Sequence, residues 1–140
     1  ISIQPLDPSG KPLAASCAGC DLAIETSIVG ISDVADINVA VIIYDANGYR
    51  LIDLHTALKG EFLSLGAGQR ATVRFLMREV LLRPGMYFAG LWLGRGGIET
   101  IDSVEYAMQF SVINNPELAK HVESFPGPYL CKFDDTISYH

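Results

Sequence analysis

Residues 41–56 read VIIYDANGYRLIDLHT, and this stretch decides the fold class. Its centre, Asn47-Gly48, is the strongest short hairpin pattern known, because both residue types tolerate the positive φ angles of a two-residue turn. The flanking residues 37–45 and 49–56 are rich in Val, Ile, Leu and Tyr, most of which favour strands. The stretch therefore predicts two antiparallel strands joined by a tight turn.

Further strand patterns lie on both sides of this hairpin. Apolar and polar residues alternate in several runs, and a period of two is typical of a strand with one buried face. In the last run the alternation predicts one common face for Val104, Tyr106, Met108, Phe110 and Val112. The remaining strand patterns are a short apolar start at 1–6 and the runs 21–29, 69–79, 86–93 and 104–113, with a possible terminal strand at 129–133.

These patterns predict one domain, residues 1–140, with seven or eight short strands. Asn115 and Pro116 are a typical helix N-cap and first-turn pair, so we expect one short helix at about 116–123. Residues 60–68 contain three glycines and are expected to form a loop. The predicted fold is an all-β antiparallel sandwich of the immunoglobulin-like or jelly-roll type.

Composition excludes several functional classes. The 140 residues carry a formal charge of −6, with 10 scattered Lys and Arg residues, so the chain lacks the basic surface that nucleic acids require. No apolar stretch reaches the roughly 20 residues that span a bilayer. There is no phosphate-binding GxxxxGK[ST] loop. The chain starts at Ile1 without an initiator Met, and we expect that something is missing upstream.

The cysteines are Cys17, Cys20 and Cys131, an odd number. The Cys17–Cys20 spacing matches half of a zinc site or a redox pair, but no second pair of Cys or His stands at ligand spacing. We therefore interpret both cysteines as reduced thiols in a loop of a cytosolic protein.

The most informative strand, 86–93, is apolar on both faces. Tyr87, Ala89, Leu91 and Leu93 form one face, and Met86, Phe88, Gly90 and Trp92 form the other. The run 37–44 has the same property. An antiparallel sandwich normally has a polar outer face, so this pattern indicates a functional surface or one covered by a loop, the C-terminal segment or a partner subunit.

Aromatic rings on an outer strand face suit sugars, whose C–H groups pack on the π-surface. The candidate rings are Phe88, Trp92 and Tyr44, and Gly90 is expected to leave room for a ligand. The polar candidates that would bind sugar hydroxyls are His55, Asp53, Arg74 and Gln109. Each polar residue alone is also compatible with an ordinary solvated outer face.

Four stretches together resemble a known family. They are residues 41–48 with 51–56, the Leu82-x-x-Gly85-x-Tyr87 strand start, residues 102–112 with their Phe-x-Val ending, and Gly127-Pro128-Tyr129. In order and spacing they resemble the C-terminal carbohydrate-binding domain of Wzt-type ATP-binding subunits of O-antigen polysaccharide ABC transporters.

The resemblance implies an immunoglobulin-like sandwich that binds the exported polysaccharide without catalysis, at its modified non-reducing end. It implies no cofactor in this domain, with ATP and Mg²⁺ held by an ATPase domain upstream. The implied partners are the polysaccharide, a second copy of the chain in a homodimer, and the membrane subunit of the transporter. The implied location is the cytoplasmic face of the bacterial inner membrane.

Two alternatives stay open on the residues alone. The chain is a structural or oligomerisation domain if its second apolar face packs on a partner. It is a glycan-acting enzyme if Asp53 pairs with Glu105 or Asp102 across a glycosidic bond.

Overall fold

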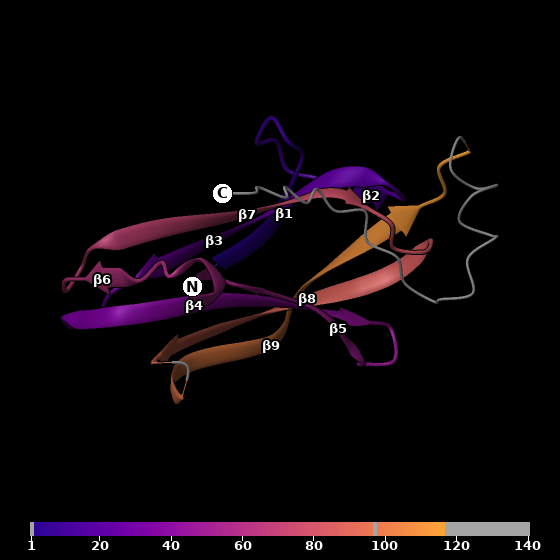
Figure 1. Cartoon of the computed structure of the whole chain (residues 1–140). Helices are drawn as coiled ribbons and strands as arrows, with labels where there is room; N and C mark the ends of the chain where they lie inside the picture. Colours follow the sequence, from indigo (N-terminus) through magenta and orange to yellow (C-terminus); the bar gives the residue numbers. More distant parts are fainter. Residues whose placement is uncertain (1, 97, 117–140) are drawn as a thin grey trace, which may run out of the picture.

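The computed structural model describes residues 2–96 and 98–116, which form two stacked β-sheets. The smaller sheet has the order β1-β3-β7 and the larger sheet the order β2-β9-β8-β4-β5, with β6 also pairing with β4. Figure 1 shows the smaller sheet as the upper layer and β4, β8, β9 and β5 as the lower layer. The strands are β1 Ser2–Leu6, β2 Ala15–Cys17, β3 Cys20–Val29, β4 Val34–Asp45, β5 Arg50–His55, β6 Leu63–Leu65, β7 Arg70–Val80, β8 Gly85–Arg95 and β9 Glu99–Ile113.

The core lies between the two sheets and is built by alternate residues of the long strands. Ile24 of β3, Val41 of β4 and Ala89 of β8 are each 0% exposed. The predicted inner row of β8 is buried along its whole length, as is the Leu22–Ile28 row of β3. The prediction of a β-sandwich is therefore confirmed, and the predicted period of two is the reason that one row per strand reaches the core.

The predicted hairpin joins β4 and β5. Ala40 pairs with His55 and Ile42 with Asp53, so the strands are antiparallel. The turn is closed by Asp45, whose Oδ1 accepts the backbone N–H groups of Asn47 and Tyr49 at 2.9 Å each. Gly48 has a φ of +84°, which explains the glycine at this turn.

Leu82-x-x-Gly85-x-Tyr87 forms a corner at the start of β8. The Tyr87 hydroxyl donates to the backbone carbonyl of Arg83 at 2.6 Å, while Leu82 and the Tyr87 ring are buried. Tyrosine corners of this kind fix strand entry in immunoglobulin-like sandwiches. Burial, with a smaller contribution from the Asp45 charge, raises the pKa of Tyr87, because both disfavour the phenolate.

Some elements differ from the sequence prediction. Two three-residue strands, β2 and β6, were not predicted, because such short segments show no period. β2 pairs with β9 in parallel, so the larger sheet is mixed rather than purely antiparallel. A short 3-10 helix, Thr56–Lys59 (η1), follows β5. The helix predicted at 116–123 and the strand predicted at 129–133 lie outside the described residues, Pro116 excepted.

The interpretation of Cys17 and Cys20 as reduced thiols is wrong, because they form a disulfide. The two cysteines flank a turn in which Gly19 has a φ of +80°, and their Cα atoms lie 5.3 Å apart, within the range that a disulfide bridges. The bond connects β2 in the larger sheet to β3 in the smaller one. It therefore closes the point at which the chain passes between the layers.

Candidate functional site

The candidate site lies on the outer face of the larger sheet. Strand pairing aligns the outward side chains of three neighbouring strands in rows. Ala40 pairs with both His55 and Trp92. In the next row, Ile42 pairs with both Asp53 and Gly90. The hairpin and β8 therefore bring together residues that are up to 52 positions apart in the sequence.

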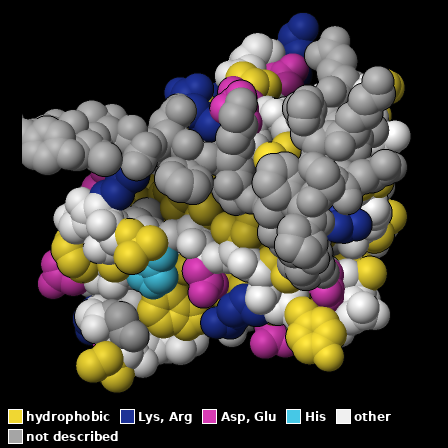
Figure 2. Space-filling view, turned by 45° about the vertical axis from the view of Figure 1, so that its right-hand side comes forward, with side chains coloured by type: hydrophobic (Ala, Val, Ile, Leu, Met, Phe, Trp, Pro, Cys, Tyr) yellow, Lys and Arg dark blue, Asp and Glu magenta, His cyan; other side chains and the backbone are white. Residues whose placement is uncertain are grey.

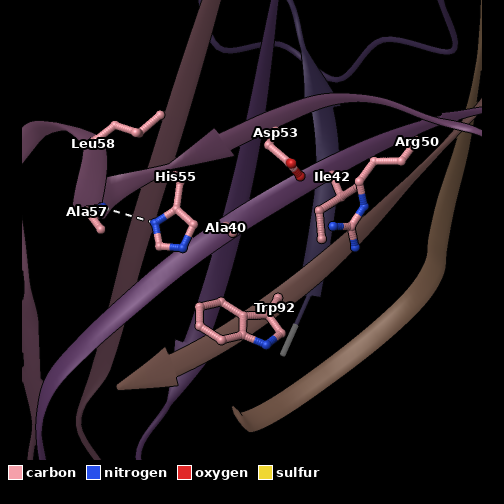
Figure 3. A pocket seen from close by; sticks show the side chains of 8 residues that line it. All are labelled: Ala40, Ile42, Arg50, Asp53, His55, Ala57, Leu58 and Trp92. Atoms are coloured by element: carbon pink, nitrogen blue, oxygen red, sulfur yellow. Dashed lines mark hydrogen bonds between the residues drawn. The ribbon is translucent and has the colours of Figure 1, made fainter. Parts of the chain in front are cut away.

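These rows line a pocket of about 530 Å³, which we call the Trp92 pocket. Its apolar part is formed by the Trp92 indole and smaller aliphatic side chains, and its polar part comes from β5. Figure 2 shows a histidine with acidic and basic side chains beside hydrophobic ones on this face. Figure 3 shows the His55 and Trp92 rings turned toward each other, with the Arg50 guanidinium beside Ile42. The lining residues are Ala40, Ile42, Arg50, Asp53, His55, Ala57, Leu58 and Trp92.

His55 is held by the start of η1. Its Nδ1 accepts the backbone N–H of Ala57 at 3.1 Å, so it caps the short helix. This bond places the proton of the neutral imidazole on Nε2, which is then a hydrogen-bond donor. The ring centroid lies 5.5 Å from that of Trp92, in a tilted arrangement. Capping therefore fixes both the orientation of the ring and the nitrogen that is free to donate.

Trp92 is held from its other side by β9 and by a neighbouring glycine. Its Nε1–H donates to Thr100 Oγ1 at 3.0 Å. A Cβ at Gly94 would collide with the six-membered ring of the indole, so the ring lies over this glycine. Gly94 therefore permits the position of the indole, and any larger residue there would displace it.

A second group of aromatic rings lies further along the same face. The ring centroids of Tyr44 and Tyr106 are 4.9 Å apart, and those of Phe88 and Tyr106 are 5.6 Å apart in an edge-to-face contact. Tyr44 is only 6% exposed, so its ring is not open to a ligand. The prediction that this ring stacks on a sugar is therefore wrong. Tyr106, not Tyr44, is the exposed ring of this group.

The expectation that Gly90 leaves room for a ligand is wrong. Its position is buried, and an added Cβ would lie 3.0 Å from the Val104 carbonyl oxygen and 3.2 Å from Tyr44 Cε2. The glycine instead allows β9 and the Tyr44 ring to approach β8 closely. The two aromatic groups are therefore separated by a filled position, not by an open slot.

Arg74 does not join the Trp92 pocket. It lies on β7 in the smaller sheet, where its Nη2 is 2.8 Å from Glu25 Oε2. It lines a separate groove of about 250 Å³ at the edges of β5 and β7, shared with Asp53 and His55. The prediction that it stands beside the aromatic surface is wrong, because alternation indicates which residues share a face but not which sheet the strand joins.

Gln109 lies on β9, paired with Phe88 and exposed. It is therefore near the second aromatic group and does not line the Trp92 pocket. Of the seven predicted residues, Trp92, His55 and Asp53 line the pocket. Phe88 and Tyr44 belong to the second aromatic group, and Gln109 lies beside it.

Sequence reasoning missed Arg50 and Tyr106. Arg50 was missed because simple alternation places it on the opposite face from Asp53 and His55. A register shift between Ile43 and Tyr44 pairs it with Tyr44 instead, and the sequence carries no signal for that shift. Tyr106 was assigned to the same face as Met108 and Phe110. That assignment is wrong, because a bulge in β9 turns the ring outward to Tyr44 and Phe88.

The carboxylates on this face are too far apart for the paired-carboxylate cleavage of a glycosidic bond. Asp53 on β5 and Glu105 on β9 are separated by two intervening strands, about 14 Å of sheet at ~4.8 Å per strand. Paired glycosidase carboxylates lie within roughly 5–9.5 Å of each other. Among residues 2–96 and 98–116 no group of three His, Cys, Asp or Glu side chains is placed to hold a metal ion.

In the described part of the chain, no helix has the length and apolar character needed to cross a bilayer.

Comparison with known proteins agrees with this architecture. The crystal structure of the C-terminal domain of Wzt superposes with a TM-score of 0.76 at 14% identity, covering 98% of this chain and 81% of that one. A β-glucuronidase from Bacteroides uniformis matches with a TM-score of 0.52 at 15% identity, over 74% of this chain but only 12% of the enzyme. Both likenesses concern the fold alone. No curated protein sequence gives a significant match.

The family model described as the Wzt C-terminal domain matches residues 1–127, almost the whole sequence. The two-sheet topology, the tyrosine corner and this match agree with one another. The chain belongs to the Wzt C-terminal domain family.

Proposed function

We propose that this domain binds an O-antigen polysaccharide through the Trp92 pocket and confers substrate recognition on an ABC transporter, without catalysis. The observation that carries the proposal is the pocket itself. An indole, an oriented histidine donor, a carboxylate and a guanidinium meet on an otherwise apolar outer sheet face. Family membership supports the same function.

The chemistry of the pocket suits a neutral or weakly charged sugar. A pyranose can pack its C–H face on Trp92, because aromatic π-surfaces attract polarised C–H groups. Hydroxyl groups can accept from His55 Nε2–H and Arg50 and can donate to Asp53. The volume of about 530 Å³ lies within the usual range for ligand sites.

The cellular setting forms part of the proposal. The domain would act at the cytoplasmic face of the bacterial inner membrane, as a homodimer linked to the membrane subunit of the transporter. ATP and Mg²⁺ would be handled by an ATPase domain upstream, and this domain would need no cofactor. The modified non-reducing end of the glycan is the part that we expect it to read.

Substitution of Trp92 tests the proposal. We expect Trp92→Ala to reduce retention on immobilised O-polysaccharide from the source bacterium at least about tenfold, equivalent to ~1.4 kcal/mol, through loss of the stacking surface. Phe62→Ala is a matched control, because Phe62 is 56% exposed and lines neither the pocket nor the groove beside it. A folded Trp92→Ala protein that binds normally would exclude this pocket as the glycan site.

A second candidate function is dimerisation. Exposed apolar residues at the β8–β9 end favour it, since Ile98 is 92% exposed and Val104 is 41% exposed. Sedimentation of the isolated domain separates the two functions. A stable dimer whose Trp92 fluorescence does not respond to the polysaccharide would favour dimerisation over glycan binding.

A further inference from the structure

Strand β9 contains a bulge opposite Gly90. Ala89 pairs with Met108 and Leu91 with Val104, so residues 105–107 all face a single residue of β8. At the centre of this bulge Tyr106 has a φ of +52°, in the left-handed region. A bulky residue is rarely found there, because its Cβ crowds its own backbone.

The strained backbone places an exposed ring at a defined position. Tyr106 contacts the rings of Tyr44 and Phe88, yet 48% of the residue is exposed. A Cβ added at Gly48 would lie 3.0 Å from the Tyr106 hydroxyl, so the turn between β4 and β5 also bounds the ring. Core packing alone does not explain strain that holds an aromatic side chain half in solvent, and such strain is typical of binding sites.

The ring borders a depression of about 320 Å³. One wall is formed by Tyr106 and Phe88, and the other by the turn at residues 45–48. Polar groups are close at hand, since Asn47 lies in this wall and the exposed Gln109 pairs with Phe88. An aromatic wall opposite a polar turn repeats the chemistry of the Trp92 pocket.

We propose that Tyr106, Phe88 and the 45–48 turn form a second sugar subsite on the same face. The inference rests on the proposed function and adds that the bound glycan must be several sugar units long. Phe88 and Trp92 are four residues apart on β8, about 13 Å at the usual strand rise. This distance exceeds one sugar ring, so the ligand class is an oligosaccharide segment of several units, not one terminal residue alone.

The two sites are connected by Arg50. It lines the Trp92 pocket and pairs in register with Tyr44, whose ring lies against Tyr106. A glycan that runs along β8 would therefore pass this guanidinium between the two aromatic groups. The positions of the two aromatic groups along β8 predict that the bound glycan runs parallel to this strand.

The test uses Tyr106→Gly, which removes the ring while glycine accepts the left-handed backbone. Fragments of the O-polysaccharide of the source bacterium, fractionated by length, are titrated by calorimetry. Wild-type affinity should rise with length and then level off. Tyr106→Gly should lose about tenfold in affinity for long fragments and bind the shortest fragment like wild type, whereas Trp92→Ala should weaken binding at every length.

Tyr49→Ala is the matched control, because Tyr49 follows the same turn, is 70% exposed and lines neither depression. If Tyr106→Gly binds all lengths like wild type while Trp92→Ala does not, the second subsite is refuted and the proposed function stands. If wild type binds no fragment of any length, the proposed function fails and the subsite fails with it.

Discussion

The two sheets of this sandwich share one core but have different outer faces. On the smaller sheet, Arg74 pairs with Glu25 and Arg78 lies near Asp21, with every cation at least partly in water. On the larger sheet the corresponding positions of β4 and β8 hold Ile42, Tyr44 and Trp92. A solvated outer face satisfies the usual sandwich pattern, and the departure from it on the other sheet is the reason that we propose that sheet as the binding face.

The two outer faces also differ in how their side chains are held. Glu25 takes hydrogen bonds from Arg74 and Gln4, interactions that solvent can replace. Trp92 and His55 are fixed by Thr100, by the start of η1 and by the absence of a side chain at Gly94. The first face is held by contacts that solvent can replace, and the second face keeps two rings in one geometry.

The largest expected difference in stability is between two variants that each introduce one aspartate, the first on the larger sheet and the second on the smaller sheet. Ile42→Asp should lower the free energy of unfolding by about 3 kcal/mol, because Ile42 is only 8% exposed and the new carboxylate lies near Asp53. Leu76→Asp, on the smaller sheet at 43% exposure, should change it by less than about 1 kcal/mol. Chemical denaturation measures both. Equal losses in the two variants would contradict the contrast between the faces.

An intermediate effect is expected from Gly94→Ala. The added methyl group must displace the Trp92 ring and break its bond to Thr100, which should reduce stability by about 1 kcal/mol and glycan retention about tenfold. Trp92 is the single tryptophan, so its fluorescence reports the movement directly.

Gly66→Ala controls for the change of residue type. A Cβ at Gly66 would meet Asp33 Oδ1 at 3.5 Å and Gln69 Oε1 at 3.7 Å, ordinary contacts that need no rearrangement. Unchanged fluorescence and retention in Gly94→Ala would show that the indole does not depend on this glycine.

The smallest effect is expected from Arg74→Ala. The Arg74 guanidinium, with a smaller contribution from Gln4, holds the pKa of Glu25 below its ordinary value of 4.5. A lowered carboxyl pKa stabilises the fold above pH 4.5, and this contribution is lost as the pH falls through the folded-state pKa. The variant should raise the Glu25 pKa in an NMR titration, be slightly less stable than wild type at pH 7, and match it in strong acid.

Glycan retention by Arg74→Ala should equal that of wild type, because Arg74 does not line the Trp92 pocket. A clear loss of retention would instead bring the groove at the β5 and β7 edges into the binding surface.

The sequence was sufficient to predict the hairpin, the long strands and the outward position of Trp92, because each depends on a local pattern of turn residues and alternation. It was insufficient for Arg74, whose sheet is decided by long-range pairing. Tyr106 was missed for a different reason: the bulge inserts extra residues opposite Gly90 and reverses the direction of one side chain. The Cys17–Cys20 bond depends on a turn geometry that the spacing alone does not specify.

The register that aligns Ala40, His55 and Trp92 has an evolutionary consequence. Strands β4, β5 and β8 each carry two interleaved sets of residues, an inner set that packs in the core and an outer set that lines the proposed binding pocket. Substitutions at Asp53 or His55 can alter hydroxyl recognition without changing a core contact of Val41 or Leu91. Under the proposed function, a scaffold of this kind can adapt to a different sugar by exchanging a few outward side chains while its core residues stay unchanged.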